Sequence, residues 1–141
     1  MKIWGTVQDG QIVPATGINI TSQCLRVPVS DGHMAAVFVR CRQKPHHGAG
    51  SSQAWQSYQG LPQQLGLPSA PKQFLHYFTE PDRPQTKLDR ELEKGMAVCM
   101  GRLRPDTQYD YKFVCLSHNT LRGAAGGAVL LAELLCAQNY I

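Results

Sequence analysis

The residues with the clearest potential for chemistry lie in one stretch, Cys24 to His33, which reads Cys-Leu-Arg-Val-Pro-Val-Ser-Asp-Gly-His. Arg26 stays charged at any accessible pH, so on an apolar strand its guanidinium requires a carboxylate, a phosphate or water opposite it. His33 follows a Ser-Asp-Gly turn, where a side chain is open to solvent and to a ligand. An arginine that holds an anion beside a histidine that moves a proton predicts half of an active site. The alternative is a solvated or salt-bridged Arg26 and an ordinary turn residue at His33.

A β-hairpin is predicted to position these two side chains. Before the turn, apolar residues alternate with others, so that one face would carry Leu25, Val27 and Val29 and the other Cys24, Arg26 and Pro28. After the turn, one face of a second strand would carry His33, Ala35, Val37 and Val39. This period of two predicts two short strands with His33 at the mouth of the hairpin. The same pattern predicts that Cys24 is a buried, inert thiol.

Three more strands are predicted downstream, at Phe74–Phe78, Met96–Arg104 and Tyr109–Leu116. A loop through Pro105 and Asp106 joins the last two, which should therefore form an antiparallel pair. In the loop-rich stretch 40–72, a short helix is predicted from Ser52. The mixed charges from Asp89 to Lys94 indicate a solvated connector.

The chain is predicted to end in a helix from Leu121 to Gln138, with Asn119 or Thr120 as its N-cap. This helix is apolar nearly all round, so it should be buried on more than one side. The small residues from Gly123 to Gly127 permit close packing of its first turn, which is favoured over a ligand site because no Gly-x-Gly-x-x-Gly fingerprint is present.

Length and composition exclude several classes of protein. The 141 residues, 43% of them hydrophobic, suit one domain, and the net charge of +4 includes no basic run of the kind that binds nucleic acid. The five cysteines form no Cys-x-x-Cys pair, which favours reduced, buried thiols over a zinc site or a disulfide framework. Adjacent residues point in different directions, so His46 and His47 do not predict a metal site. Without a long apolar leader or a membrane-length apolar run, the protein is expected to be cytoplasmic and unattached to membranes.

Two motifs resemble those of one enzyme family. Arg-Val-Pro-Val-Ser-Asp-Gly-His from Arg26 and Ser-His-Asn-Thr-Leu-Arg-Gly-Ala-Ala-Gly from Ser117 are similar to segments of aspartate-semialdehyde dehydrogenases, and stretches 69–73 and 81–85 resemble the fungal branch. The similarity runs from Lys2 to Ile141. The chain is identified as a member of this family, as the C-terminal, substrate-binding and dimerisation portion of a fungal-type enzyme.

The resemblance implies roles for four residues. His33 would be the acid/base, Arg26 would bind the substrate carboxylate, Lys2 would bind a substrate anion, and Asn119 would reach the nicotinamide of NADP. One departure is that Met34 and Ala35 stand where the family usually has Ser or Thr and then Glu.

The resemblance also implies a fold and a domain plan. The fold would be α+β, a mostly antiparallel or mixed sheet with helices on one face, like the second domain of glyceraldehyde-3-phosphate dehydrogenases. Residues 1–120 would form the substrate-binding and dimerisation domain. Residues 121–141 would form a closing helix that packs on an N-terminal NADP-binding domain. A homo-oligomer, a dimer or higher, is expected.

The implied activity is the NADPH-dependent reduction of β-aspartyl phosphate to aspartate semialdehyde, in the biosynthesis of the threonine, methionine and lysine family of amino acids. None of the five cysteines has the family's Ser-Asn-Cys nucleophile setting, so the nucleophile and the dinucleotide fingerprint are expected in an N-terminal half. The 141 residues alone should be inactive and hold no NADP. The alternatives are a related acyl-phosphate reductase of the N-acetylglutamyl-phosphate type and a catalytically silent dimerisation module.

Overall fold

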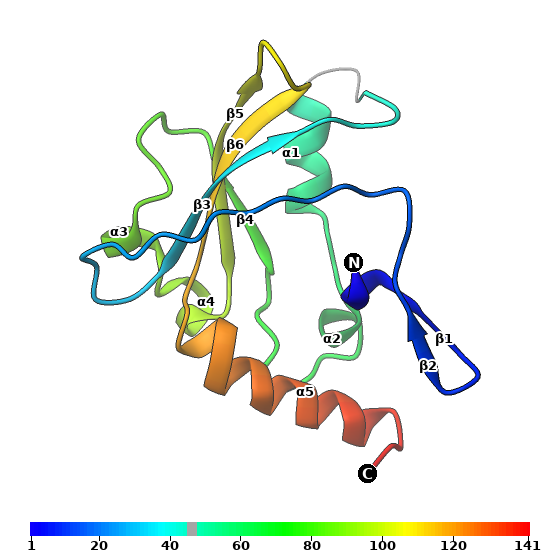
Figure 1. Cartoon of the computed structure of the whole chain (residues 1–141). Helices are drawn as coiled ribbons and strands as arrows, with labels where there is room; N and C mark the ends of the chain where they lie inside the picture. The colour runs from blue at the N-terminus through cyan, green and yellow to red at the C-terminus, as the bar shows by residue number, and fades with distance from the viewer. Residues whose placement is uncertain (45–47) are drawn as a thin grey trace.

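The centre of the computed structural model, which describes residues 1–44 and 48–141, is a mixed sheet (Figure 1). In the described residues its strand order is β3-β6-β5-β4, with bounds β3 (His33–Val39), β4 (Leu75–Phe78), β5 (Val98–Pro105) and β6 (Tyr111–Ser117). Strand β6 runs antiparallel to both β3 and β5, whereas β4 and β5 are parallel. The predicted α+β class and the predicted antiparallel pair are therefore confirmed.

The turn between β5 and β6 is fixed by one carboxylate. Asp106 accepts hydrogen bonds from the backbone N–H groups of Gln108 and Tyr109, both at 3.0 Å, and pairs with Lys112 at 2.8 Å. The hydrogen bond from Lys112 and the two backbone donors hold the pKa of Asp106 well below its usual range. Local sequence is enough to build this turn, which explains why it was predictable.

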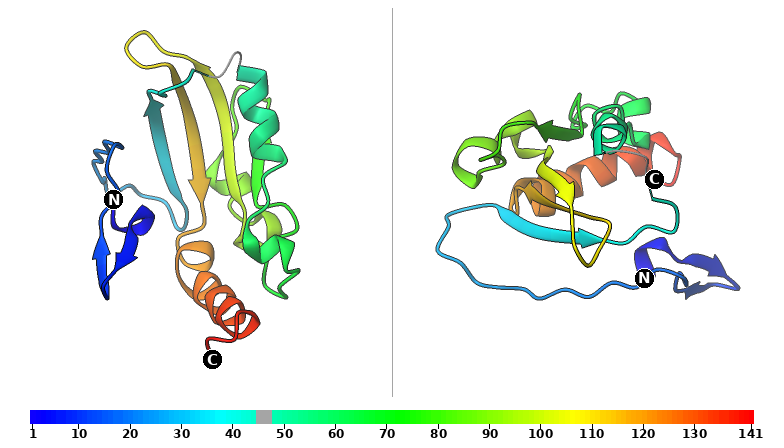
Figure 2. Two further views of the ribbon diagram at one scale, coloured as in Figure 1. Left: turned by 90° about the vertical axis from the view of Figure 1, so that its right-hand side faces the viewer. Right: turned by 90° about the horizontal axis from the view of Figure 1, so that it is seen from above.

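One face of the sheet is covered by helix α1 (Gly48–Gln56), which lies over β4 and β5 (Figure 2). Its Trp55 ring packs 5.8 Å from the Tyr77 ring and 5.0 Å from the Phe113 ring. These contacts supply a large apolar area between the helix and the sheet. The helix predicted from Ser52 is therefore present and begins earlier, at Gly48.

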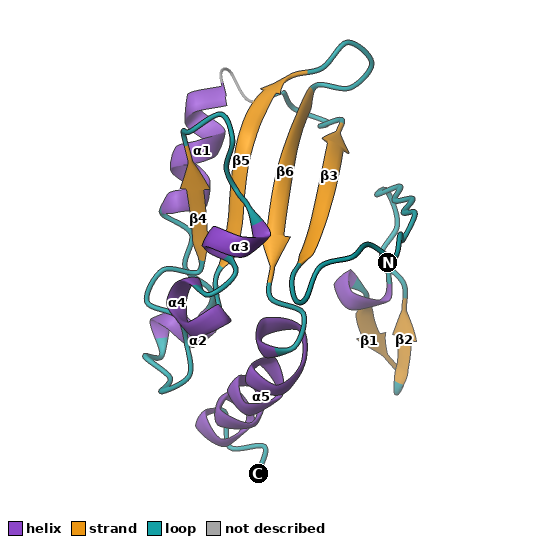
Figure 3. Cartoon of the chain, turned by 90° about the vertical axis from the view of Figure 1, so that its left-hand side faces the viewer, coloured by secondary structure: helices purple, strands orange, loops and turns teal. Residues whose placement is uncertain are grey.

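The opposite face is covered by segment 80–97, which contains the single-turn helices α3 (Thr86–Asp89) and α4 (Leu92–Gly95) (Figure 3). The buried core on this side consists of Ala97, Cys99 and Leu116, with Phe78 and Leu92 packed against it. Helical turns thus lie on both faces, an addition to the expectation of helices on one face.

The predicted solvated connector is wrong for its first residue. Asp89 has no exposed surface and accepts hydrogen bonds from Arg83, through Nε at 2.8 Å and through Nη2, and from the Gln85 N–H at 2.6 Å. The Arg83 guanidinium in turn lies 4.6 Å from the centre of the Phe78 ring. A buried carboxylate with this set of donors is a structural anchor for segment 80–97.

The closing helix consists of a π-helical turn, η2 (Leu121–Ala125), followed by α5 (Gly126–Ala137). A Cβ on Gly126 would lie 2.5 Å from the Met96 sulfur, so the predicted close packing of small residues occurs here. Of its large apolar residues Leu130 is buried, whereas Val129 and Leu131 are 52% and 55% exposed. Within this chain, α5 is thus covered on one side.

The first 30 residues form what we call the N-terminal arm. It contains η1 (Lys2–Trp4) and a small sheet of β1 (Thr6–Gln8) and β2 (Gln11–Val13), and then passes outside β3, the edge strand of the main sheet (Figure 2). A short helix, α2 (Leu61–Gln64), follows α1 and precedes β4 in the sequence. No helix in the part of the chain that the structure describes is long and apolar enough to cross a membrane.

The predicted hairpin of residues 24–39 is wrong in its first half. Strand β3 forms as predicted, but its partner is β6, and residues 24–29 join no sheet. Pro28 has no N–H to donate, and the Val29 N–H is spent on the Val27 carbonyl at 2.9 Å in a tight local turn. The alternation of side chains predicted an extended backbone, which is present. It does not provide the hydrogen bonds to a neighbouring strand that a sheet requires.

Candidate functional site

The two sequence motifs meet at one end of the sheet. His33 is the first residue of β3 and stands opposite Ser117, the last residue of β6. The Asn119 side chain accepts a hydrogen bond through Oδ1 from the Gly32 N–H at 2.7 Å. Two segments 87 residues apart in sequence are therefore joined directly beside His33.

Glycine is required at the centre of this junction. Gly32 is buried and has a φ of +109°, a conformation that residues with a Cβ rarely adopt. A Cβ here would also lie 3.2 Å from side-chain atoms of both Leu116 and Thr86. The turn is thus packed between β6 and α3, which fixes the backbone that leads into His33.

The bond from Gly32 also orients the Asn119 amide. Because Oδ1 is the acceptor, the Nδ2 group points elsewhere, and none of the described residues accepts a hydrogen bond from it. Asn119 was predicted as a possible helix cap, as was Thr120. Neither side chain caps η2, and the N–H groups of Thr120 and Leu121 instead donate to Nδ1 of His118, both at 3.3 Å.

The other two predicted site residues lie on the N-terminal arm. Arg26 is exposed on the extended segment before the turn, and Lys2 is exposed in η1. Figure 1 shows the N-terminus beside β1 and β2, well apart from the start of β3. The structure therefore brings His33 and Asn119 together, whereas among the described residues no hydrogen bond or ion pair joins Arg26 or Lys2 to either of them.

The cysteines differ in exposure. Burial, followed by the charge of Asp89, raises the pKa of the Cys99 thiol to about 12, and burial also raises the pKa of Cys115. These two are suited to packing rather than to nucleophilic attack, which requires a thiolate. The expectation of buried thiols is wrong for Cys24 and Cys136, which are exposed. Cys24 is exposed because its segment joins no sheet, and Cys136 lies near the end of α5.

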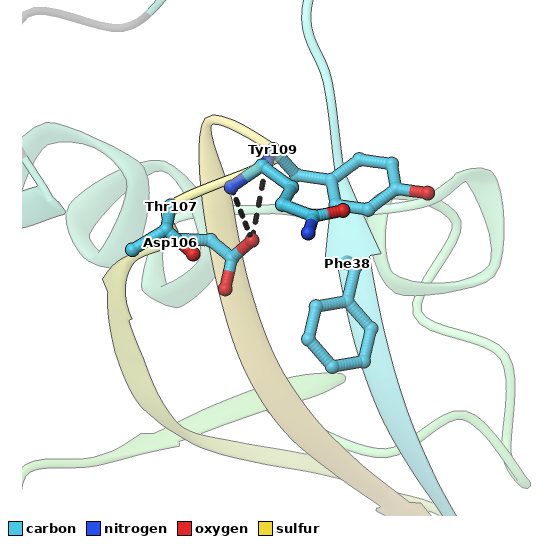
Figure 4. Close-up of a pocket in the computed structure, with 5 residues that line it drawn as sticks. Phe38, Asp106, Thr107 and Tyr109 are labelled. Atoms are coloured by element: carbon cyan, nitrogen blue, oxygen red, sulfur yellow. Dashed lines mark hydrogen bonds between the residues drawn. The ribbon is translucent and has the colours of Figure 1, made fainter.

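An open hollow lies far from this junction, where β3 ends beside the β5–β6 turn (Figure 4). It is lined by Phe38, Asp106, Thr107, Gln108 and Tyr109. The Asp106 carboxylate is already engaged by its own turn, so the hollow offers no free charge to a ligand. His46 and His47, which do not predict a metal site, lie outside the described residues, and no cluster of three His, Cys, Asp or Glu side chains that could hold a metal occurs within those residues.

Reasoning from sequence missed Arg90 and His118. Arg90 donates from Nη1 to Ser30 Oγ at 2.8 Å, and His118 is 4% exposed beside Asn119. The mixed charges around Arg90 concealed its contact with a turn 60 residues away. For His118 a signal existed, since a histidine between a strand and a helix start can accept the first free N–H groups of the helix.

Comparison with known proteins gives a consistent result. Residues 1–122 match the family described as "Semialdehyde dehydrogenase, dimerisation domain". An aspartate-semialdehyde dehydrogenase of Aspergillus fumigatus is 45% identical over 129 residues, which cover 89% of this chain and 36% of the relative. One from Candida albicans is 42% identical over 130 residues, 92% of this chain and 36% of the relative.

A solved structure agrees with the sequence relatives. The crystal structure of aspartate-semialdehyde dehydrogenase with NADP from Candida albicans superposes with a TM-score of 0.87 at 41% identity, over 99% of this chain and 40% of that one. The chain thus spans little more than a third of the length of the curated relatives it matches. On the family match and these relatives, the chain belongs to the semialdehyde dehydrogenase dimerisation-domain family.

Proposed function

We propose that this chain is the substrate-binding and dimerisation part of a fungal-type, NADP-dependent aspartate-semialdehyde dehydrogenase. The activity would be the reduction of β-aspartyl phosphate to aspartate semialdehyde. The observation that carries the proposal is the junction of the two motifs, in which Asn119 holds the backbone of Gly32 at 2.7 Å beside His33. The sequence relatives support the same reaction, because they bear its name.

His33 would be the general acid/base. It lies exposed at the end of an edge strand, where a substrate has access, and its backbone is held on both sides by Gly32 and β6. A fixed imidazole within reach of a substrate can move a proton during acyl transfer, which contributes about 10²–10⁴-fold to a rate. The position of His33 is therefore suited to proton transfer during the reaction.

Arg26 and Lys2 would bind anionic groups of the substrate. Neither takes part in an ion pair within the described part of the chain, so both positive charges remain available. A guanidinium can hold a carboxylate through two parallel hydrogen bonds, whereas an ammonium acts as a point charge. Since Arg26 is seven residues before His33, docking of the arm would deliver it to the same site.

Asn119 would contact the cofactor. NADPH supplies the hydride when it is bound, and its carboxamide carries a carbonyl that accepts hydrogen bonds. The Nδ2 group of Asn119 fits this role, because Gly32 takes the oxygen of the side chain and leaves its two N–H donors. One such contact orients a nicotinamide ring but binds no phosphate.

The domain plan and the assembly are part of the proposal. Residues 1–120 would form the substrate-binding and dimerisation domain, and residues 121–141 would pack on an NADP-binding domain. The family match over residues 1–122 and the exposure of Val129 and Leu131 on α5 support this division. We further propose a homo-oligomer located in the cytoplasm. The family description as a dimerisation domain supports the oligomer.

A chimera tests the proposed function. The matching part of the Candida albicans enzyme, which superposes on 99% of this chain, would be replaced by these 141 residues. We expect NADP-dependent oxidation of aspartate semialdehyde in the presence of phosphate. A chimera that is folded and oligomeric but inactive would contradict the proposed function.

Variants of the chimera test the roles. His33→Ala should lower kcat by about 10²–10⁴-fold, and Arg26→Ala should mainly raise KM, with about 1.5–3 kcal/mol of substrate binding lost. The matched control is His76→Ala, because His76 lies on β4 and contacts Gln73 and Glu93 instead of the junction. Unchanged kinetics in His33→Ala would rule out the acid/base role.

A further inference from the structure

The turn before His33 is held by side chains from two other segments. Arg90 donates from Nη1 to Ser30 Oγ at 2.8 Å and to the Asp31 carbonyl at 3.4 Å, and Asn119 accepts from the Gly32 N–H. The three residues immediately before His33 are thus each held by a residue far away in sequence. A turn with this many tertiary contacts has one backbone path, whereas an exposed turn alone has several.

His118 fixes the segment that carries Asn119. Two backbone donors point at its Nδ1, namely the N–H groups of Thr120 and Leu121 at 3.3 Å each, and the Thr120 hydroxyl oxygen lies 3.1 Å from the same nitrogen. A proton on Nδ1 would repel these donors, so Nδ1 is the acceptor and the ring proton lies on Nε2. Since His118 is 4% exposed, the ring cannot rotate away without opening the core.

Glu91 connects the two holding groups. Its Oε1 accepts a hydrogen bond from Arg90 Nε at 3.2 Å and lies 3.5 Å from His118 Nε2. The planar Arg90 guanidinium can donate to Glu91 and Ser30 at once, which a lysine ammonium on a flexible stem does less specifically. Asp89, which directly precedes Arg90 and Glu91, is fixed in the core by its hydrogen bond from Arg83. The backbone that carries Arg90 and Glu91 is therefore held in place.

We propose that Arg90, Glu91 and His118 form a positioning network that sets the spacing between His33 and Asn119. Within the described part of the chain none of the three forms a hydrogen bond or an ion pair with His33, so they are positioning residues. The geometric part of the proposal stands on these contacts alone. Its catalytic meaning rests on the function proposed above, which gives His33 and Asn119 their roles.

Hydrogen exchange and NMR of the 141-residue chain test the geometric part without any activity. Glu91→Ala should speed exchange of the Gly32 amide by about fivefold, the effect expected when one typical hydrogen bond is weakened, and should shift the His33 ring signals. Glu91 is 62% exposed, so its removal leaves no buried hole. The matched control is Glu93→Ala, because Glu93 contacts His76 and the Lys72 N–H and should leave Gly32 and His33 unchanged.

Two variants of His118 distinguish a local effect on the position of Asn119 from a loss of global stability. His118→Leu removes the acceptor for the Thr120 and Leu121 N–H groups and should raise exchange at Gly32 at least as much as Glu91→Ala. His118→Asn places an amide oxygen near the Nδ1 position and should restore most of the protection at Gly32. The slowest amides of β5 and β6 report global unfolding and should change little in the rescued variant.

Several outcomes would overturn the network. They are an unchanged exchange rate of the Gly32 amide in Glu91→Ala, an equal effect in Glu93→Ala, or an exchange rate at Gly32 that only follows global unfolding.

In the chimera, Glu91→Ala should lower kcat several-fold while the KM for aspartate semialdehyde stays near the parent value. If Glu91→Ala speeds exchange at Gly32 but the parent chimera is inactive, the network is retained and the proposed function is rejected. If the parent chimera is active but Gly32 exchange is unchanged in Glu91→Ala, the network is rejected.

Discussion

The pairing of Arg83 with Asp89 predicts an unequal cost for removing its two members. Asp89 has no exposed surface, whereas the Arg83 side chain is 26% exposed. If Asp89 is replaced by Asn, the guanidinium can turn toward water, and the loss is that of charged hydrogen bonds, about 1.5–3 kcal/mol. If Arg83 is replaced by Ala, the Asp89 carboxylate remains buried without its partner, which costs about 3–5 kcal/mol.

The same pair predicts how the difference depends on pH. Burial by itself raises the pKa of Asp89, but the hydrogen bonds from Arg83 and Gln85 and the charge of Arg83 outweigh burial and lower it. A lowered pKa gives stability that is present above the unfolded pKa, about 3.9, and is lost as the pH falls through the folded value. In Arg83→Ala only burial and the Gln85 bond remain, so the cost of the variant should shrink below about pH 4, as the stranded carboxylate takes up a proton.

Urea unfolding at pH 7 and pH 3.5, followed by the fluorescence of Trp55 in the α1–sheet interface, measures both effects. With a slope of about 2 kcal/mol per molar urea, Arg83→Ala should lower the midpoint by about 1.5–2.5 M at pH 7. The matched control is Arg104→Ala at an exposed position, which should change stability by less than about 0.5 kcal/mol. A larger loss of stability in Asp89→Asn than in Arg83→Ala, or an equal loss in Arg83→Ala at both pH values, would contradict the unequal roles of the two residues.

Three further predictions concern the thiols, the cofactor and assembly. Alkylation of the native chain should label the exposed Cys24 and Cys136 and spare Cys99, whose pKa is raised to about 12 by burial; peptide mass spectrometry reports this, and rapid native labelling of Cys99 would contradict it. Calorimetric titration with NADPH should show no micromolar binding, because Asn119 offers one contact and no phosphate cradle; binding at that level would reveal a cofactor site elsewhere in the chain. Light scattering at micromolar concentration should show a dimer or larger species, and Leu131→Glu should reduce it, since Leu131 is 55% exposed on α5; a stable monomer would refute this account of the surface.

Strands and turns that depend on local sequence were predictable, as the pair β5 and β6 illustrates. Alternation from Met96 to Leu116 marks the two strands, and Asp106 closes their turn with contacts to Gln108 and Tyr109 only a few residues away. The motifs at His33 and Asn119 were also visible, but their contact was not. It is a hydrogen bond between segments 87 residues apart, and no local pattern encodes such a pairing.

Patterns of residue type predicted the wrong environment where one specific contact, and not the average character of the segment, decided the outcome. Asp89 stands in a run of charges that favours solvent, yet it is buried because Arg83 and the Gln85 N–H satisfy its carboxylate. Alternation from Leu25 to Val29 is typical of a strand, yet the segment lies free because a local turn at Pro28 uses the one N–H next to it. A period of two reports an extended backbone and cannot report whether the backbone has a partner.

The two halves of the proposed site therefore differ in how they are held. His33 and Asn119 are fixed by contacts within this chain, through Gly32 and β6, and their geometry does not depend on another protein surface. Arg26 lies on an arm whose apolar neighbours Leu25 and Val27 are 79% and 54% exposed, and burying such side chains contributes about 1.5–3 kcal/mol each. That free energy is available only when a further surface covers the arm. If the proposed roles hold, proton transfer at His33 would depend on the fold of this chain, whereas the placement of Arg26, and with it substrate affinity, would depend on assembly.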